Sequence, residues 1–283
     1  MIAPRLTFVT GKGGTGKSTV AAALALALSH RYPTTLAELD PRQGAAALLT
    51  ASKRLHIQPL NAHAELETFI RRIVPVAAIS RRMLSSRTFG YVTAALPGLG
   101  AFLLLERFRI LAGDAALQDH YVVVDGPASG TAVELLGVAR GLIELAPAGT
   151  LNRLASAVES FLRDAELFGA AIIVAPEQLA LGEALETASA LRDRLGISSV
   201  RAVLNRAVDG AFTRSELGLL NGHPAGALAE RRAHEHTLAT RAQRTLRQAG
   251  LPTVCLPMLF TERIGAEQVA QLAARLNREV PRR

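Results

Sequence analysis

Short, nearly continuous apolar runs alternate with longer stretches of helical periodicity along most of the chain. The first run, Arg5–Gly11, is rich in apolar and β-branched residues and ends in glycine, which is typical of a buried strand. A helix rich in Ala and Leu is predicted to follow it. The predicted strands cover residues 5–11, 34–40, 120–125, 170–175, 200–205 and 251–257. Apolar strands that alternate with helices favour a doubly wound α/β fold, with a mostly parallel sheet covered on both faces.

The stretch between the second and third predicted strands departs from this alternation. It shows helical periodicity, with breaks at Pro75 and Pro97. We therefore predict a single domain over residues 1–283 that carries a helical subdomain inserted at about residues 45–118. The last helical piece, Leu96–Leu111, is more apolar than a solvent-facing helix requires. Two interpretations stay open: this face packs on the sheet, or it is an exposed docking surface for a partner or client.

Composition limits the class of protein. With 49% hydrophobic residues, 4% aromatic residues and no tryptophan, the core must be built mainly from Leu, Ala, Val and Ile. The single cysteine, Cys255, cannot form an internal disulfide or a zinc-binding pair, which suits a reducing cytoplasm. We see no signal peptide and no uninterrupted apolar run of about 18 residues, so we expect a soluble cytoplasmic protein. The net charge of +8 would suit nucleic acid, anionic lipid or an acidic partner, or it reflects arginine spread over helix surfaces.

A phosphate-binding loop follows the first predicted strand. Gly11–Ser18 fits the pattern G-x-x-x-x-G-K-[ST] without a mismatch, and it lies between a strand and a helix, as the motif requires. Backbone amides of small residues can turn inward and cradle phosphate oxygens, and the dipole of the following helix adds to their effect. The residues predicted to hold the nucleotide here are Gly11, Gly13, Gly14, Thr15, Gly16, Lys17, Ser18 and Thr19. Lys17 would bind the β- and γ-phosphates, and the Ser18 hydroxyl would complete the coordination of Mg²⁺.

Polar residues mark the ends of other predicted strands. Asp40, Asp125 and Asn205 each close an apolar run, as the glycine loop does. Ligands of open α/β sheets bind beyond the carboxyl ends of the strands. We therefore expect these residues to gather at one edge of the sheet.

The same loop carries a second lysine, Lys12. Only three of the 32 basic residues are lysine, and two of those three lie in this loop. Lys12 is either a solvated loop residue or a second phosphate ligand. It cannot easily fold back onto phosphates held by its own loop, but it could reach the nucleotide of a second subunit across a dimer. There it would neutralise charge that develops in the transition state, much as an arginine finger does.

The loop "GKGGTGKST" resembles the deviant Walker A loop of the SIMIBI class of P-loop NTPases, which contains the arsenite-pump ATPase, the tail-anchored-protein targeting ATPase, MinD, ParA and the nitrogenase iron protein. This resemblance implies that ATP and Mg²⁺ are the cofactors and that Lys12 acts in trans across a nucleotide-sandwich dimer. The helical region and the segment before Asn205 are similar to those of small bacterial arsenite-pump-type ATPases. The resemblance covers nearly the whole chain and is weakest in residues 210–250.

The resemblance also assigns roles to four further residues. "LAELDPRQG" resembles switch I, so Asp40 would orient the attacking water and bind Mg²⁺ weakly through water. "VVVDGPASG" resembles switch II, so Asp125 would hold waters around Mg²⁺. "AVLNRAV" places Asn205 where the family reads the adenine edge, and "CLPMLF" places Pro257 near the same base.

The implied activity is Mg²⁺-dependent ATP hydrolysis by a homodimer, or by a heterodimer with a paralogous ATPase. The implied partner is a hydrophobic protein client or a membrane-associated protein, and the helical insertion argues against nucleic acid. Switch I usually continues Asp-Pro-Ala-His but here reads Asp-Pro-Arg-Gln, and Thr131 stands where switch II usually has His. Turnover could therefore be slow or need a partner subunit. Two alternatives stay open: a ParA/MinD-like positioning ATPase that binds DNA or membrane, and a subunit that holds ATP without hydrolysing it.

Overall fold

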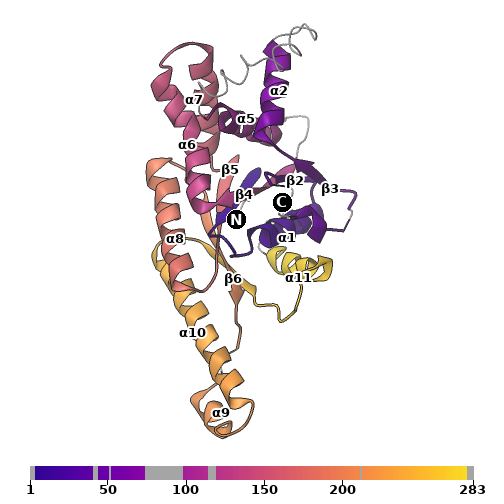
Figure 1. The fold of residues 1–283 in the computed structure, drawn as a ribbon, viewed down its shortest axis with the longest axis vertical. Coiled ribbons are helices and arrows are strands. Elements are labelled where there is room, and N and C mark those ends of the chain that lie inside the picture. Colours follow the sequence, from indigo (N-terminus) through magenta and orange to yellow (C-terminus); the bar gives the residue numbers. More distant parts are fainter. Residues whose placement is uncertain are drawn as a thin grey trace.

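A parallel sheet forms the centre of the protein (Figure 1). The computed structural model describes residues 4–40, 44–50, 52–73, 98–113, 119–210 and 212–278. In this part of the chain, seven strands pair in parallel in the order β3-β2-β4-β1-β5-β6-β7. The strands are β1 Leu6–Gly11, β2 Thr34–Glu38, β3 Leu55–Pro59, β4 Tyr121–Ala128, β5 Phe168–Val174, β6 Val200–Ala207 and β7 Thr253–Pro257. The predicted doubly wound α/β fold is confirmed.

Helices cover both faces of the sheet (Figure 1). On one face, α1 and α11 pack against each other and against a core that includes Val9. On the other face, α2, α5, α6, α7, α8 and α10 enclose a larger core that includes Phe8. The helices of the described residues are α1 Lys17–Ser29, α2 Ala62–Ile73, α5 Leu99–Gly113, α6 Ser129–Leu145, α7 Gly149–Arg163, α8 Gln178–Ser189, α9 Arg214–Leu219, α10 Gly226–Gln248 and α11 Ala266–Leu276. Two short turns accompany them, the 3₁₀ turn Ala46–Leu48 and the π-helical turn Ala190–Arg194.

The alternation of Phe8 and Val9 between two cores follows from strand geometry, since successive side chains point to opposite faces. Both faces are covered, so both sets of side chains must be apolar. Every residue of β5 is buried, for example. This explains why the central strands read as continuous apolar runs rather than as alternating ones.

The predicted helical subdomain needs one correction. Its expected start at about residue 45 is wrong, because Leu55–Pro59 forms β3 and pairs with β2 at the edge of the sheet. β3 has three half-buried and two exposed side chains, and it ends in proline. A strand of this kind lacks the apolar run that identifies a central strand. The predicted break at Pro75 lies outside the described residues, as does the break at Pro97.

Of the two interpretations of the apolar helix, packing on the sheet is the correct one for the described residues of α5. Five of its side chains are buried, and they are Phe102, Leu103, Leu104, Leu105 and Phe108. The ring of Phe108 lies 6.1 Å from that of Phe8 on β1. These side chains therefore belong to the central core and are not available as a docking surface.

The arginine-rich helix α10 extends away from the sheet and carries α9 at its far end (Figure 1). Its last turns bury Ala239, Ala242 and Leu246. Towards its start, Arg232 donates a hydrogen bond to the carbonyl oxygen of Asp209, just after β6. Among the described residues, no helix combines the length and apolarity needed to cross a bilayer.

Candidate nucleotide site

The glycine loop joins β1 to α1 at the carboxyl edge of the sheet. β1 lies between β4 and β5, where the chain order reverses direction across the sheet. Open parallel sheets leave a crevice at such a switch point, because the helices on its two sides cover opposite faces. The fold therefore places the predicted phosphate loop where a ligand can enter.

Two glycines of the loop have conformations that a side chain would disturb. Gly11 has a φ of 146°, and a Cβ there would lie 2.3 Å from the carbonyl oxygen of Ile173. Gly16 has a φ of 93°, and a Cβ there would lie 2.5 Å from Nδ2 of Asn205. These positions need glycine both for the backbone angle and for the close approach of neighbouring strands.

Hydrogen bonds within the protein hold the loop in shape. The carbonyl oxygen of Lys12 accepts hydrogen bonds from Oγ1 of Thr15, at 2.8 Å, and from Nζ of Lys17, at 3.3 Å. Nδ2 of Asn205 donates to the carbonyl oxygen of Thr15 at 2.8 Å. Asn205 thus supports the loop from β6, in addition to lying where the sequence places a base-reading residue.

A pocket of about 240 Å³ opens beside the loop. Its lining includes the predicted residues Gly16, Thr19, Asn205 and Pro257. The remaining wall is formed by Arg206, Met258, Leu259, Thr261, Ile264 and Leu272. Apolar walls with a few polar groups suit a flat heterocyclic base. The two residues predicted near the adenine therefore line one cavity, although they come from different strands.

Asp125 and Ser18 form the part of the site that fits Mg²⁺. The Ser18 side chain is hydrogen-bonded to Asp125, whose Oδ1 is buried and has no hydrogen-bond partner among the described residues. Burial raises the pKa of Asp125, and the charges of Glu38 and Asp40 raise it further, whereas Ser18 and Lys17 lower it. A buried carboxylate oxygen without a partner is costly, and Mg²⁺ prefers oxygen ligands. These residues would hold a cation together with phosphate and water oxygens.

The acidic side of the site includes one residue that the sequence analysis did not select. Glu38, at the end of β2, is buried, and its Oε1 accepts a hydrogen bond from the backbone amide of Ala46 at 2.8 Å. Asp40 follows it and acts electrostatically on Asp125. Within the described ranges, no three His, Cys, Asp or Glu side chains are grouped so that they could hold a metal by themselves. The hydrogen bond of Glu38 joins the end of β2, two residues before Asp40, to the 3₁₀ turn at Ala46.

The two loop lysines lie in different positions. Lys17 folds over its own loop, and burial lowers the pKa of its amine, while the charges of Asp125 and Glu183 oppose that effect. Lys12 is directed to α8, where its Nζ lies 3.7 Å from Oε2 of Glu183. Glu183 also accepts a hydrogen bond from the Ser129 hydroxyl. Nothing in the sequence distinguishes Glu183 from the other glutamate of the same predicted helix, Glu186.

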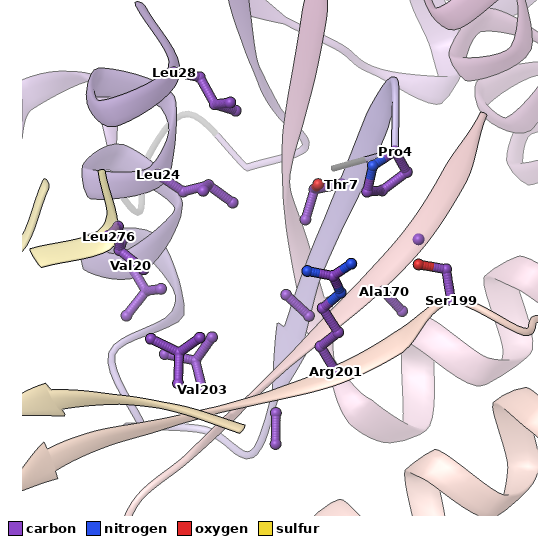
Figure 2. A pocket seen from close by; sticks show the side chains of 14 residues that line it. Pro4, Thr7, Val20, Leu24, Leu28, Ala170, Ser199, Arg201, Val203 and Leu276 are labelled. Atoms are coloured by element: carbon purple, nitrogen blue, oxygen red, sulfur yellow. The ribbon is translucent and has the colours of Figure 1, made fainter. Parts of the chain in front are cut away.

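A second cavity, of about 90 Å³, lies at the opposite edge of the sheet (Figure 2). It is lined by the first residues of β1, β5 and β6 and by Leu24 and Leu28 of α1. The small residues Gly169 and Ala171 leave this space beneath α1, and the guanidinium group of Arg201 extends into it (Figure 2). Burial lowers the pKa of Arg201. This cavity is separate from the glycine loop, which lies beyond the other ends of the same strands.

All residues predicted for the site thus lie at one edge of the sheet, and what each of them does remains a prediction. A family model described as "CobQ/CobB/MinD/ParA nucleotide binding domain" matches residues 6–280. The chain is 28% identical over 234 residues to ATPase BagA of Mycobacterium tuberculosis. The aligned region covers 75% of this chain and 68% of that protein. The same values hold for "Putative ATPase Mb3704" of Mycobacterium bovis.

Proposed function

Because the chain belongs to the CobQ/CobB/MinD/ParA nucleotide-binding domain family, we propose that it is a Mg²⁺-dependent ATPase that works as a dimer, of the arsenite-pump and tail-anchored-protein targeting type. The dimer consists of two copies or of this chain and a paralogous ATPase. Hydrolysis in the cytoplasm switches a surface that binds a hydrophobic protein client or a membrane-associated partner. The names of the mycobacterial relatives support the ATPase activity.

In this proposal, different residues of the site bind the phosphates, hold Mg²⁺ and orient the attacking water. Loop amides and Lys17 bind the phosphates, and Ser18 and Asp125 hold Mg²⁺, which neutralises charge on the β- and γ-phosphate oxygens. Asp40 orients the attacking water. A carboxylate is a weak base, so the orientation of the water by Asp40 contributes more than proton abstraction.

The observation that carries the proposal is the separation of the two loop amines. Lys17 Nζ lies against its own loop, whereas Lys12 Nζ is held at α8 and its side chain is 38% exposed. This position of Lys17 supports the proposed role of its amine in binding the phosphates in cis. Lys12 is accessible from outside the subunit, which is required of a group that acts on the nucleotide of a second subunit.

Alanine variants of the three lysines test this division. Lys12→Ala should lower ATP hydrolysis at least about 100-fold, as loss of an arginine finger does, and leave ATP affinity within about three-fold. Lys17→Ala should weaken ATP binding itself. Lys53→Ala changes the remaining, exposed lysine and should alter neither property. Hydrolysis is measured as phosphate release, and affinity by titration with a fluorescent ATP analogue.

The proposal fails if Lys12→Ala abolishes binding, or if it hydrolyses ATP at the wild-type rate. Single-turnover hydrolysis decides whether the protein hydrolyses ATP at all. The wild-type protein should convert bound ATP to ADP, and Asp40→Asn should not. Equal, negligible conversion by both would instead identify a subunit that only holds ATP.

A second candidate is a positioning ATPase of the ParA and MinD kind. The family model includes MinD and ParA, and the net charge of +8 would attract a phosphate backbone. ATP-dependent retention on DNA or on anionic vesicles, measured as salt is raised, separates this candidate from the first. Retention that needs ATP and falls steeply with salt would favour it.

A further inference from the structure

Glu183 lies between parts of the site that are far apart in the sequence. One oxygen of its carboxylate accepts a hydrogen bond from the hydroxyl of Ser129, the first residue of α6. The other oxygen is 3.7 Å from Nζ of Lys12 in the glycine loop. A single side chain on α8 therefore connects this loop to the helix that directly follows β4, the strand of Asp125.

The carboxylate also acts on the second loop lysine. Burial lowers the pKa of Lys17, and the charges of Asp125 and Glu183 both oppose that effect. Both loop amines thus lie in the field of Glu183. A triphosphate in the loop brings several negative charges to the Lys17 amine, and therefore into the same field. In a half-buried site, where water screens charge incompletely, the carboxylate and the phosphates repel each other.

We propose that the Glu183 carboxylate is a latch that the terminal phosphate of ATP displaces: without nucleotide it holds Lys12 and Ser129, and with ATP it releases both. Glu183 then helps to set the balance between ATP and ADP, since ADP lacks the phosphate that would compete with it. Release would free Lys12 from α8 and the start of α6 from α8. The inference rests on the proposed function only in that this loop binds ATP.

The contacts of Glu183 are suited to a latch rather than to a permanent structural bond. Its side chain is 36% exposed and its partner Lys12 is 38% exposed, so water can replace both groups after release. A salt bridge between half-exposed groups contributes little to stability. Loss of the pair should therefore change nucleotide binding more than it changes folding.

Glu183→Gln tests the latch, because glutamine keeps an oxygen acceptor for Ser129 and removes the charge. It should raise the affinity for a non-hydrolysable ATP analogue by about three-fold or more, with a smaller rise for ADP. The difference from wild type should shrink as salt is raised. Glu186→Gln is the matched control, because it removes the same charge from an exposed position on the same helix and should leave both affinities unchanged.

Glu183→Ala, which favours the helix, serves as a second variant if the glutamine variant does not fold. The latch is overturned if the variant binds ATP no more tightly than wild type, or if ATP and ADP affinities rise equally. Wild-type protein that binds no ATP would overturn both the latch and the proposed function. Normal hydrolysis by Lys12→Ala would overturn the trans role of Lys12 and leave the latch intact.

Discussion

At the scale of single residues, Asp125 shows a conflict between folding and the proposed activity. The side chain is buried, its Oδ1 lacks a hydrogen-bond partner within the part of the chain that the structure describes, and two other carboxylates act on it electrostatically. These features destabilise the ionised form in the ligand-free protein. They are the features expected of a carboxylate that binds a cation in the functional state.

Asp125→Asn should therefore stabilise the ligand-free protein at neutral pH, by about 1 kcal/mol in the free energy of unfolding, because it removes a buried charge that is only partly compensated by Ser18 and Lys17. In the wild type, the raised pKa of Asp125 means that the folded state binds its proton more tightly than the unfolded state does. Its unfavourable contribution should thus disappear as pH falls through the folded pKa. Urea unfolding at several pH values measures both effects.

The same variant should lose the extra stabilisation that Mg²⁺ gives in the presence of ATP. Glu134→Gln, which changes an exposed carboxylate on α6, is the control and should alter neither the stability nor its pH dependence. A less stable Asp125→Asn protein would show that the Asp125 charge is already compensated in the ligand-free state. In that case the argument that this carboxylate awaits a cation would be wrong.

At the scale of elements, the packing of α5 determines whether its apolar face is part of the core or a docking surface. If α5 belongs to the core, Phe108→Ala should lower the free energy of unfolding by about 3–5 kcal/mol, because it removes a fully buried ring that packs on Phe8. Ile110→Ala, on the same helix but 37% exposed, should cost less than about 1 kcal/mol. Denaturant unfolding measures both. Similar small losses for the two variants would mean that α5 is only loosely attached and could expose its apolar face.

The contrast between β5 and β3 explains how much of the fold the sequence could predict. β5 is buried on both faces, so its apolar run identified it directly. β3 lies at an edge, two of its five side chains are exposed, and its backbone pairs with β2. An edge strand of this kind is defined by its neighbour in the sheet, which the sequence of the strand does not contain.

A similar contrast applies to the site. Lys12, Lys17, Ser18 and Asp125 could be selected because a phosphate loop and a strand end carry local signals. Glu183 could not be selected, because its proposed role depends on contacts with residues 54 or more positions away in the sequence. Periodicity places it on a helix but does not show which helix face meets the loop.

At the scale of the whole molecule, the position of Lys12 has a consequence for assembly. If Lys12 acts on phosphates from the surface of its subunit, as proposed, a second subunit must bring the nucleotide to it. In a two-fold dimer, each subunit would give one lysine and receive one. Each active site would then depend on Lys12 of one chain and Asp40 of the other.

This dependence can be tested by mixing two inactive variants, Lys12→Ala and Asp40→Asn. In a mixed dimer, the nucleotide bound by the Lys12→Ala subunit has its own Asp40 and receives an intact Lys12 from the other subunit. When equal amounts of the two variants exchange subunits at random, half of the dimers are mixed, and each mixed dimer has one complete site. The mixture should therefore regain about a quarter of wild-type ATP hydrolysis. If Lys12 acts within its own subunit, no combination contains a complete site. A dimer confirmed by its mass that gains no activity on mixing would therefore place Lys12 in cis, whereas recovery that grows with the fraction of mixed dimers can arise only across the interface.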